Sequence, residues 1–525
     1  MIDILRTPDD IRIYCDRDNV DTVVTTEIVG RKMQVKVTAT ESKPKMICLR
    51  WKCKITEPTR VMGDRWERSY GDMSWNSLNG EIFMPWYFLA SNGKTTVGCG
   101  VMVRPSSYVC FQCDANGVSA WFDVRCGGVG VDLGGRELLA GEIVCEKYEG
   151  ISEIDAATKF CSVMCEDPIF PREAVYGSNN WYYAYGKSSY EEITEDAAVI
   201  AQLAKGNSTP PFMVIDDGWQ KNPVEGPWIP NERYGDMSGI TAEFKNIGVR
   251  PGIWFRPLHN TELETAHPDW CICHKEGKKA YLDPSHPDVK EYIKKTIEDI
   301  KGWGFELIKH DYSTFDMFGD YGNKLNGCIT NYKGWSFYDK TKTSAQITLD
   351  FYKLIREAAG EMYIIGCNTV SHLCAGLVEI NRIGNDTSGM QWNTTRANGV
   401  NTLAFRMCQN NTFYKIDADC VGLMEKNIDW RLNRQWLDLL ARSGSPLFVS
   451  MQPSQITDAI ADDLKKAFEI SSRQTDVAKP MDWLYNNTPQ LWEINGETVV
   501  YDFVMDDYPL PAKEIYATLS PSLMF

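Results

Sequence analysis

The sequence predicts a multidomain α/β protein in which a central (β/α)8 TIM barrel is flanked by an N-terminal β-sandwich and a small C-terminal β-domain. Two observations support this prediction. Strand-like and amphipathic helical segments alternate over residues 172–453, whereas short strand-like runs dominate residues 1–171 and 454–525. In addition, 525 residues exceed what one hydrophobic core holds, since single cores stop growing near about 250–300 residues.

The sequence pattern of the N-terminal region is typical of an antiparallel β-sandwich. Strand-like runs occupy Met33–Thr40, Thr96–Val103 and Ala120–Arg125, and the glycine-rich stretch Gly127–Gly135 supplies turns. No long segment with helical periodicity interrupts them. Many short strands separated by turn residues are typical of a β-sandwich.

The central region alternates between two periodicities. Apolar runs of strand length stand at 212–215, 251–255, 305–309 and 362–365, and amphipathic helical stretches at 288–300 and 344–355. Such alternation predicts parallel strands joined by crossover helices. The length of the region suits a (β/α)8 barrel, which typically takes about 250 residues. In the C-terminal region, residues 491–503 predict a hairpin that turns at Asn495-Gly496.

Composition excludes several classes of function. The net charge of −16 and the pI near 5.0 disfavour binding to nucleic acid, whose phosphate backbone an acidic surface repels. No apolar run approaches 18 residues, so neither a membrane span nor a membrane partner is expected. The N-terminus lacks the basic and apolar regions of a signal peptide. Together with an odd number of 17 cysteines, this predicts a reduced, cytoplasmic protein, although a lost signal stays an alternative.

We expect no metal and no cofactor. Cys110 and Cys113 have the spacing of a zinc knuckle, but no second pair follows, and a buried strand explains them better. The six histidines show no metal-ligand spacing. No nucleophile elbow, phosphate-binding loop or zinc-protease motif is present.

Carboxylates that directly follow barrel strands are the candidates for chemistry, because barrel active sites lie at the C-terminal ends of the strands. Asp216 and Asp217 follow one such strand, with Trp219 nearby. Two adjacent carboxylates are costly unless something pairs them, and binding to sugar hydroxyls is one explanation. A helix cap with a turn residue is the alternative.

Lys309 and Asp311 form the second candidate pair. Side chains alternate along a strand, so the two share one face at the strand end. The lysine would keep the carboxylate ionised, as a nucleophile requires. An ordinary ion pair at the barrel rim is the alternative. His310, which lies between them, should point to the opposite face of the strand.

Asp386 and the pair Asp417 and Asp419 complete the set of carboxylates. Apolar and aromatic neighbours of Asp386, including Met390 and Trp392, favour the protonated form that a general acid needs, but a helix-capping role is equally compatible. For Asp417 and Asp419 we favour a structural role. Two carboxylates on opposite sides of one sugar are what glycoside hydrolysis requires.

At these residues the chain resembles glycoside hydrolase families 27 and 36, the α-galactosidase or melibiase-like clan. The resemblance spans about 175–450. It implies that Asp311 is the nucleophile, with Lys309 touching the sugar, and that Asp386 is the general acid/base, with Arg382 binding hydroxyls. It also implies that the carboxylates of Asp216 and Asp217 hold the 4- and 6-hydroxyls of galactose, and Trp219 of the same segment is expected to bind substrate as well. Residues that correspond to other elements of the family pattern are Cys367, Asp419 and 443–450.

The resemblance predicts a retaining exo-acting α-galactosidase that acts on an oligosaccharide or glycoside. We include Trp181 and Trp254 among the expected substrate-binding residues. The segment Gly366–His372 departs from both families, which leaves open a related sugar such as an α-N-acetylgalactosaminide or a β-L-arabinopyranoside, and transfer to a sugar instead of water. A catalytically inactive carbohydrate-binding protein is the alternative from a different class. By analogy with family 36 a homo-oligomer is possible.

Overall fold

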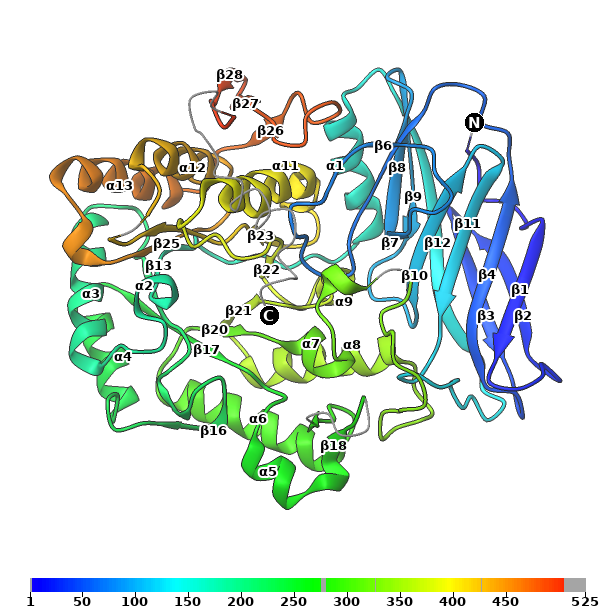
Figure 1. The fold of residues 1–525 in the computed structure, drawn as a ribbon, viewed down its shortest axis with the longest axis horizontal. Coiled ribbons are helices and arrows are strands. Elements are labelled where there is room, and N and C mark those ends of the chain that lie inside the picture. Colours follow the sequence, from blue (N-terminus) through cyan, green and yellow to red (C-terminus); the bar gives the residue numbers. More distant parts are fainter. Residues whose placement is uncertain (1, 275–279, 326, 426, 505–525) are drawn as a thin grey trace.

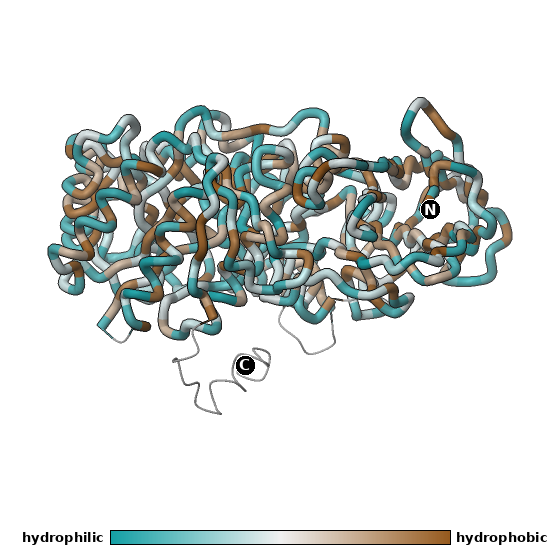
Figure 2. The backbone as a smooth tube through the Cα atoms, turned by 90° about the horizontal axis from the view of Figure 1, so that it is seen from above, coloured by the Kyte–Doolittle hydropathy of each residue, from teal (hydrophilic) through white to brown (hydrophobic). Residues whose placement is uncertain are grey.

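The computed structural model describes residues 2–274, 280–325, 327–425 and 427–504. Figure 1 shows the N-terminal strands, in blue and cyan, as upright sheets on one side of the molecule. The barrel with its helices fills the other side, and the last three strands, β26 to β28, lie above it. The expected architecture of a TIM-like barrel beside antiparallel sheets is therefore confirmed. Seen from above, hydrophilic and hydrophobic segments alternate along the tube throughout both parts (Figure 2).

The N-terminal region is a sandwich of two antiparallel sheets. One sheet has the order β1 (Asp10–Cys15), β4 (Pro44–Lys52), β11 (Gly117–Asp123), β10 (Tyr108–Asp114), β7 (Met84–Pro85). The other has the order β2 (Val23–Val29), β3 (Lys32–Thr38), β12 (Leu138–Glu149), β9 (Thr95–Val101), β8 (Tyr87–Ser91), β5 (Arg60–Gly63), β6 (Asn76–Ser77). The ring centroids of Phe88 and Phe111 lie 5.7 Å apart across the two sheets. The apolar faces thus meet, as sandwich packing requires.

The central sheet consists of parallel strands. Its order is β23 (Lys415–Asp417), β22 (Ile380–Arg382), β21 (Tyr363–Gly366), β20 (Leu307–His310), β17 (Arg250–Phe255), β14 (Phe212–Ile215), β13 (Tyr176–Asn179), β25 (Leu447–Met451), β24 (Cys420–Leu423). The two outermost strands, β23 and β24, are separated only by Ala418 and Asp419, and Asp419 has a φ of 73°. They are therefore two halves of one bent strand. Since β23 pairs with β22 and β24 with β25, this bent strand closes an eight-stranded barrel.

Helices cover the outside of the barrel. Both predicted helices are confirmed, within α6 (Pro287–Gly302) and α8 (Ser344–Ala359). Thr343 caps α8 in a reciprocal box with Gln346, which satisfies two backbone donors at its start. The other longer helices are α1 (Glu153–Met164), α3 (Tyr190–Leu203), α4 (Met237–Asn246), α12 (Trp430–Arg442) and α13 (Asp458–Ser471). Among the helices of the described ranges, none has the length and apolar character that crossing a membrane requires.

The barrel has a core of its own. Side chains from successive strands point inward and form one cluster, separate from the larger core that the sandwich shares with the outer helices. The interior cluster consists of Val175, Tyr182, Phe212, Val214, Leu307, Tyr363, Ile365, Ile380, Cys420 and Phe448. Packing below the barrel mouth therefore holds the strand ends in fixed positions.

The C-terminal region begins with a helix that was not predicted from the sequence. The sequence pattern from about residue 455 predicts strands, but helix α13 occupies Asp458–Ser471 and packs against α12, α3 and β13. Strands follow only from β26 (Ala478–Pro480). The predicted hairpin is confirmed in β27 (Leu491–Ile494) and β28 (Glu497–Val500), with positive φ at both Asn495 and Gly496. Those angles are what the two-residue turn requires.

One segment of the sandwich, residues 64–72, reaches the barrel mouth. Ser69 forms a parallel bridge with Gly384, just beyond β22, and its N–H donates to Ile383. Behind it, buried Asp64 accepts from Arg406 at 2.8 Å and from Gln409 at 2.9 Å. These buried bonds fix the segment where it can contribute to a site.

Candidate active site

Asp311 lies directly after β20, at the C-terminal end of the barrel. Its Oδ2 accepts from the indole nitrogen of Trp254 at 3.2 Å, and its Oδ1 accepts from the backbone N–H of Tyr312 at 2.7 Å. Tyr312 has a φ of 63°, a left-handed conformation that costs energy for a residue with a side chain. The sharp turn aims its N–H at the carboxylate. Asp311 is therefore held in one orientation.

Electrostatics keep Asp311 ionised. Desolvation by itself would raise its pKa, but the positive charges of Lys309 and Arg68 outweigh it, and the hydrogen bonds from Tyr312 and Trp254 add to their effect. The pKa of Asp311 is consequently lowered from its ordinary value. A carboxylate in this state is suited to act as a nucleophile.

Lys309, near the end of β20, forms an ion pair with Asp216, which directly follows β14. Its Nζ lies 2.8 Å from Oδ2 of Asp216, which also accepts from Asn179 at 2.7 Å. Burial would lower the pKa of Lys309, but Asp216 and the other nearby anions hold it well above its usual value. The side chains predicted from separate strand ends are thus brought together in one ion pair.

Asp217 points to a different set of partners. Its Oδ1 accepts from the Gln220 side chain at 2.6 Å and from the Val224 N–H at 2.8 Å. Burial, reinforced by the charge of Asp216, raises its pKa. Asp216 is thus paired with Lys309, whereas the raised pKa of Asp217 reflects its burial and the repulsion expected between adjacent carboxylates.

Trp219 does not face the site. It has no exposed surface, and its indole N–H donates to the backbone carbonyl of Trp254 at 2.8 Å. The expected contact of Trp219 with the sugar is therefore replaced by a supporting role. Trp219 donates a hydrogen bond to the backbone of Trp254, and the indole of Trp254 donates one to Asp311. Trp181, the first residue of α2 (Trp181–Ala184), is partly exposed and packs at 5.3 Å against the ring of Tyr185.

Arg382 lies at the end of β22 and is 2% exposed. One of its nitrogens lies 2.7 Å from Oδ2 of Asp419 and 3.1 Å from Oδ1 of Asp386. Asp419 also accepts from the Thr387 N–H at 2.7 Å and from the hydroxyl of Tyr182. The structural role favoured for Asp419 agrees with this geometry, because it anchors the arginine that contacts Asp386.

Asp386 is the exposed member of the pair, with 53% of its side chain open to solvent. The apolar and aromatic surroundings expected from the sequence are not what it contacts. Its Oδ1 lies between two guanidinium groups, Arg382 at 3.1 Å and Arg68 at 3.8 Å. Sequence neighbours such as Trp392, which is buried and donates to Phe503, point elsewhere.

Arg68 is a residue of the candidate site that was not predicted from the sequence. It comes from segment 64–72 of the sandwich, affects the pKa of Asp311 and contacts Asp386. The rings of Tyr70 and Tyr321 lie 5.6 and 5.9 Å from its guanidinium carbon. The local run Arg65–Arg68, charged and aromatic within a strand-rich region, was the available signal. That run contains no signal that shows which domain the Arg68 side chain contacts.

Glu67, next to Arg68, ties three parts of the site together. This fully buried carboxylate accepts from the hydroxyl of Tyr70 at 2.6 Å, the N–H of Gly322 at 2.6 Å and the amide of Asn368 at 2.7 Å. Three donors on one acceptor compensate for its burial. The sandwich segment and two barrel loops therefore form one rigid rim.

The loop after β21 contains Cys367 and Asn368. Cys367 is buried, and burial together with the charge of Asp311 raises the pKa of its thiol well above the usual value. Asn368 has a φ of 57°, and its amide is committed to Glu67. This is the segment that departs from the family pattern, and the structure shows it fixed by the sandwich.

His310 is oriented as expected, away from Asp311. It is buried on the outer side of β20, 6.0 Å from the ring of Tyr352 in α8, and burial lowers its pKa to about 4. Within the described parts of the chain, no group of three or more His, Cys, Asp or Glu side chains is placed to hold a metal ion.

The resemblance stated from the sequence is confirmed by comparison with known families. Residues 178–357 match the melibiase family model. This range contains Asp216, Asp217, Lys309 and Asp311 and ends before Arg382 and Asp386. Among curated proteins, no sequence matches this chain.

Solved structures share the fold over almost the whole chain. The α-galactosidase TtGalA from Thermus thermophilus, in complex with p-nitrophenyl α-D-galactopyranoside, is 14% identical with a TM-score of 0.62, and the match covers 94% of this chain and 97% of that one. The GH36 α-galactosidase AgaA from Geobacillus stearothermophilus is 12% identical with a TM-score of 0.60, covering 92% and 76%. The α-galactosidase from Lactobacillus brevis is 11% identical with a TM-score of 0.59, covering 94% and 75%.

Proposed function

We propose that this chain, which carries a melibiase domain on the fold of the α-galactosidases, hydrolyses terminal α-D-galactosides with retention of configuration. The observation that carries the proposal is the difference between two carboxylates that follow β20 and β22, two strands of the barrel with only β21 between them. Asp311 is fixed and held ionised by cations, whereas Asp386 is open to solvent and held by Arg382. Nucleophile and general acid/base are the two roles that such a pair performs in glycoside hydrolysis.

The reaction would take place in two steps. In the first, Oδ of Asp311 attacks the anomeric carbon while Asp386 gives its proton to the departing oxygen, so a covalent glycosyl-enzyme forms and the aglycone leaves. In the second, Asp386 takes a proton from water, which attacks the anomeric carbon and releases Asp311. The exposure of Asp386 suits it to exchange protons with solvent between the steps.

The sugar-binding residues follow from the same site. We propose that Asp216, Asp217 and Lys309 bind hydroxyls of the galactosyl group, and that Trp254 lies against it while holding Asp311. Cys367, Arg382 and Trp181 complete the substrate-binding set, and Trp219 supports it from behind. The Thermus thermophilus neighbour was solved with p-nitrophenyl α-D-galactopyranoside and also with stachyose, which supports α-galactosides as the substrate class.

The experiment is a screen of aryl glycosides combined with analysis of the first product. We expect turnover of p-nitrophenyl α-D-galactoside, and NMR should show α-galactose as the first product before it mutarotates. β-Galactose as the first product would contradict retention. Binding of galactosides without turnover of any of them would indicate the inactive carbohydrate-binding alternative.

A second candidate is the same chemistry on a related sugar. Asn368, with its amide fixed by Glu67, occupies the loop that departs from both families. By resemblance this loop borders the 2-position of the sugar. The N-acetylamino analogue and the β-L-arabinoside therefore belong in the same screen, and a higher kcat/KM for either than for the galactoside would favour this candidate.

A further inference from the structure

We propose that Arg256 is a positioning residue for the reaction, because its buried guanidinium group holds the two backbone segments whose N–H groups orient Asp311 and Asp217. This inference rests on the proposed function and deepens it. Arg256 directly follows β17 and is 5% exposed. It would act on the two carboxylates through Tyr312 and Val224, and not on the substrate.

Tyr312 and Val224 share an unusual backbone conformation. Each has a φ of 63°, in the left-handed region that is uncommon for a tyrosine and an outlier for a β-branched residue such as valine. Each also donates its N–H to a carboxylate of the site, Tyr312 to Asp311 at 2.7 Å and Val224 to Asp217 at 2.8 Å. Backbone in such a conformation persists only where the surrounding structure holds it. Both donors therefore depend on contacts that fix their residues.

Arg256 makes such a contact with each of them. Its guanidinium carbon lies 4.1 Å from the ring centroid of Tyr312, and its Nη1 donates to the backbone carbonyl of Val224 at 3.5 Å. A guanidinium group is planar and carries its donors around its edge, so it can cover a ring and donate to a carbonyl at the same time. One side chain thereby links the loop after β20 to the loop after β14.

Asp316, in the short helix α7 (Ser313–Phe318), fixes Arg256 in turn. Its two carboxylate oxygens accept from Nε and Nη2 of Arg256 at 2.9 and 2.5 Å, and Asp316 has no exposed surface. The backbone N–H of Asp316 donates to the carbonyl of Tyr312 at 2.8 Å. Tyr312 is therefore held at its ring, at its carbonyl and at the N–H that binds Asp311.

A second arginine at the opposite end of β17 provides a matched comparison. Arg250 lies 4.3 Å from the ring centroid of Phe212 and donates to Glu306 at 2.7 Å, so it has the same kinds of partner as Arg256. It stands at the start of the strand, whereas the candidate site lies at the strand ends. Neither Phe212 nor Glu306 is among the described residues with left-handed backbone. Its contacts support packing without orienting a carboxylate of the site.

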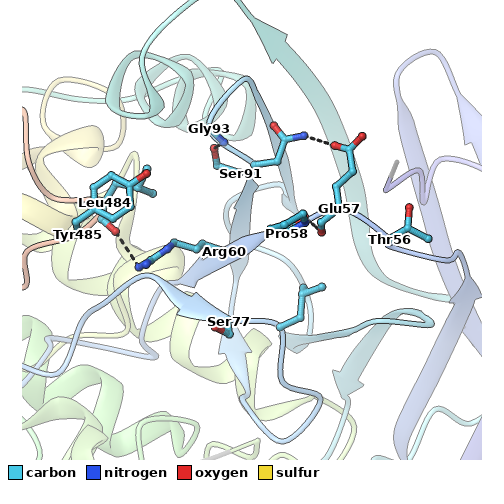
Figure 3. Close-up of a pocket in the computed structure, with 12 residues that line it drawn as sticks. Thr56, Glu57, Pro58, Arg60, Ser77, Ser91, Gly93, Leu484 and Tyr485 are labelled. Atoms are coloured by element: carbon cyan, nitrogen blue, oxygen red, sulfur yellow. Dashed lines mark hydrogen bonds between the residues drawn. The ribbon is translucent and has the colours of Figure 1, made fainter.

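A third arginine indicates why burial matters. Arg60 lies 4.9 Å from the ring centroid of Tyr485 and donates to the carbonyl of Leu484 at 3.2 Å, in a groove of about 610 Å³ between the sandwich and the C-terminal segment (Figure 3). Tyr485 is 75% exposed, so water competes for both partners. The attraction between a cation and a ring is stronger when both are desolvated, as they are at Arg256.

The test is the substitution Arg256→Lys, with Arg250→Lys as the matched control. Lysine keeps the charge opposite Asp316, but its ammonium group cannot cover the Tyr312 ring, bind both oxygens of Asp316 and reach Val224 at once. We expect kcat for p-nitrophenyl α-D-galactoside to fall about tenfold to a hundredfold, the scale of effect that a small misplacement of a reacting group has. KM should rise, because Asp217 is proposed to bind the sugar. Arg250→Lys should leave both unchanged.

The pH profile of kcat/KM is the readout that a loss of packing alone does not move. The Tyr312 N–H is one of the groups that lower the pKa of Asp311, so this pKa should rise when the hydrogen bond weakens. The acidic limb should therefore move to higher pH in Arg256→Lys and stay in place in Arg250→Lys. The charged and titratable groups that act on Asp311, or on which it acts, are Lys309, Arg68, His310, Tyr312, Tyr321 and Cys367. All of them are kept in both variants.

A second variant, Arg256→Met/Asp316→Asn, removes the ion pair without leaving a buried charge unpaired, so it decides the matter if Arg256→Lys does not fold. It should show the same changes at larger size, and thermal unfolding establishes that each variant is folded. An unmoved acidic limb with unchanged kcat in a folded Arg256 variant, or equal changes in Arg250→Lys, would overturn the positioning role while the proposed function stands. No turnover of the galactoside by the unmodified protein would overturn both.

Discussion

The two candidate catalytic carboxylates both follow a barrel strand, yet their surroundings differ. Asp311 takes its supporting groups largely from its own strand end, with Lys309 two residues before it and the Tyr312 N–H directly after it. Asp386 depends on Arg382 and on Arg68, which comes from the other domain. Each acid thus has a cation from its own strand end and a partner from elsewhere in the chain, Trp254 for Asp311 and Arg68 for Asp386. What separates them is exposure, since 53% of the Asp386 side chain is open to solvent. The two roles that we propose differ, although both carboxylates follow a barrel strand, because their neighbouring charges and their exposure differ.

The largest expected effect comes from removing the fixed carboxylate. Asp311→Ala should lower kcat by about 10⁴-fold or more, the scale seen when a covalent nucleophile is lost. Steady-state kinetics with p-nitrophenyl α-D-galactoside measure it. Asp299→Ala, an exposed position on α6, is the matched control and should retain full activity. Activity of Asp311→Ala within tenfold of the unmodified protein would remove the nucleophile assignment.

A smaller and substrate-dependent effect is expected at the exposed carboxylate. Asp386→Ala should lower kcat/KM for a disaccharide by about 10²–10⁴-fold, since its leaving oxygen needs a proton. The loss should be much smaller with α-galactosyl fluoride, because fluoride departs without one. Parallel kinetics on the two substrates measure the difference. An equal loss on both would mean that Asp386 does not act as the acid.

The smallest effect concerns Arg68, which contacts Asp386 and whose charge lowers the pKa of Asp311. Arg68→Gln removes a positive charge that lowers the pKa of Asp311, so that pKa should rise. Since the nucleophile must be ionised, the acidic limb of the kcat/KM profile for α-galactosyl fluoride should move to higher pH. At neutral pH the loss should stay within about tenfold, because Lys309 still holds the Asp311 carboxylate ionised.

The control for this profile is Arg60→Gln, which removes a guanidinium group at the start of β5 that lies over the ring of Tyr485, 4.9 Å from its centroid. It should leave the acidic limb where it is. If Arg68→Gln moved the limb to lower pH, or if both variants moved it alike, the electrostatic link between Arg68 and Asp311 would be wrong.

Much of the fold follows from local patterns. Four strands of the barrel (β14, β17, β20 and β21), the helices α6 and α8 and the hairpin at Asn495-Gly496 each have a periodicity or a turn signal that a short window of sequence contains. Helix α13 was missed because its amphipathic pattern stands in a region interpreted as strands. The bend at Asp419, which closes the barrel through one divided strand, has no such local signal.

The sequence by itself determined which side chains can reach the barrel mouth, because a strand end and its period of two place Asp216, Lys309, Asp311 and Arg382 there. Only the tertiary structure decided what surrounds them. The burial of Trp219 depends on packing within the barrel, where its ring meets Trp228 and Trp303. The placement of Arg68 beside Asp386 and the attachment of Asn368 to Glu67 depend on how the sandwich docks on the barrel. Contacts between segments hundreds of residues apart are fixed by packing of complete domains, and no periodicity within one segment records them.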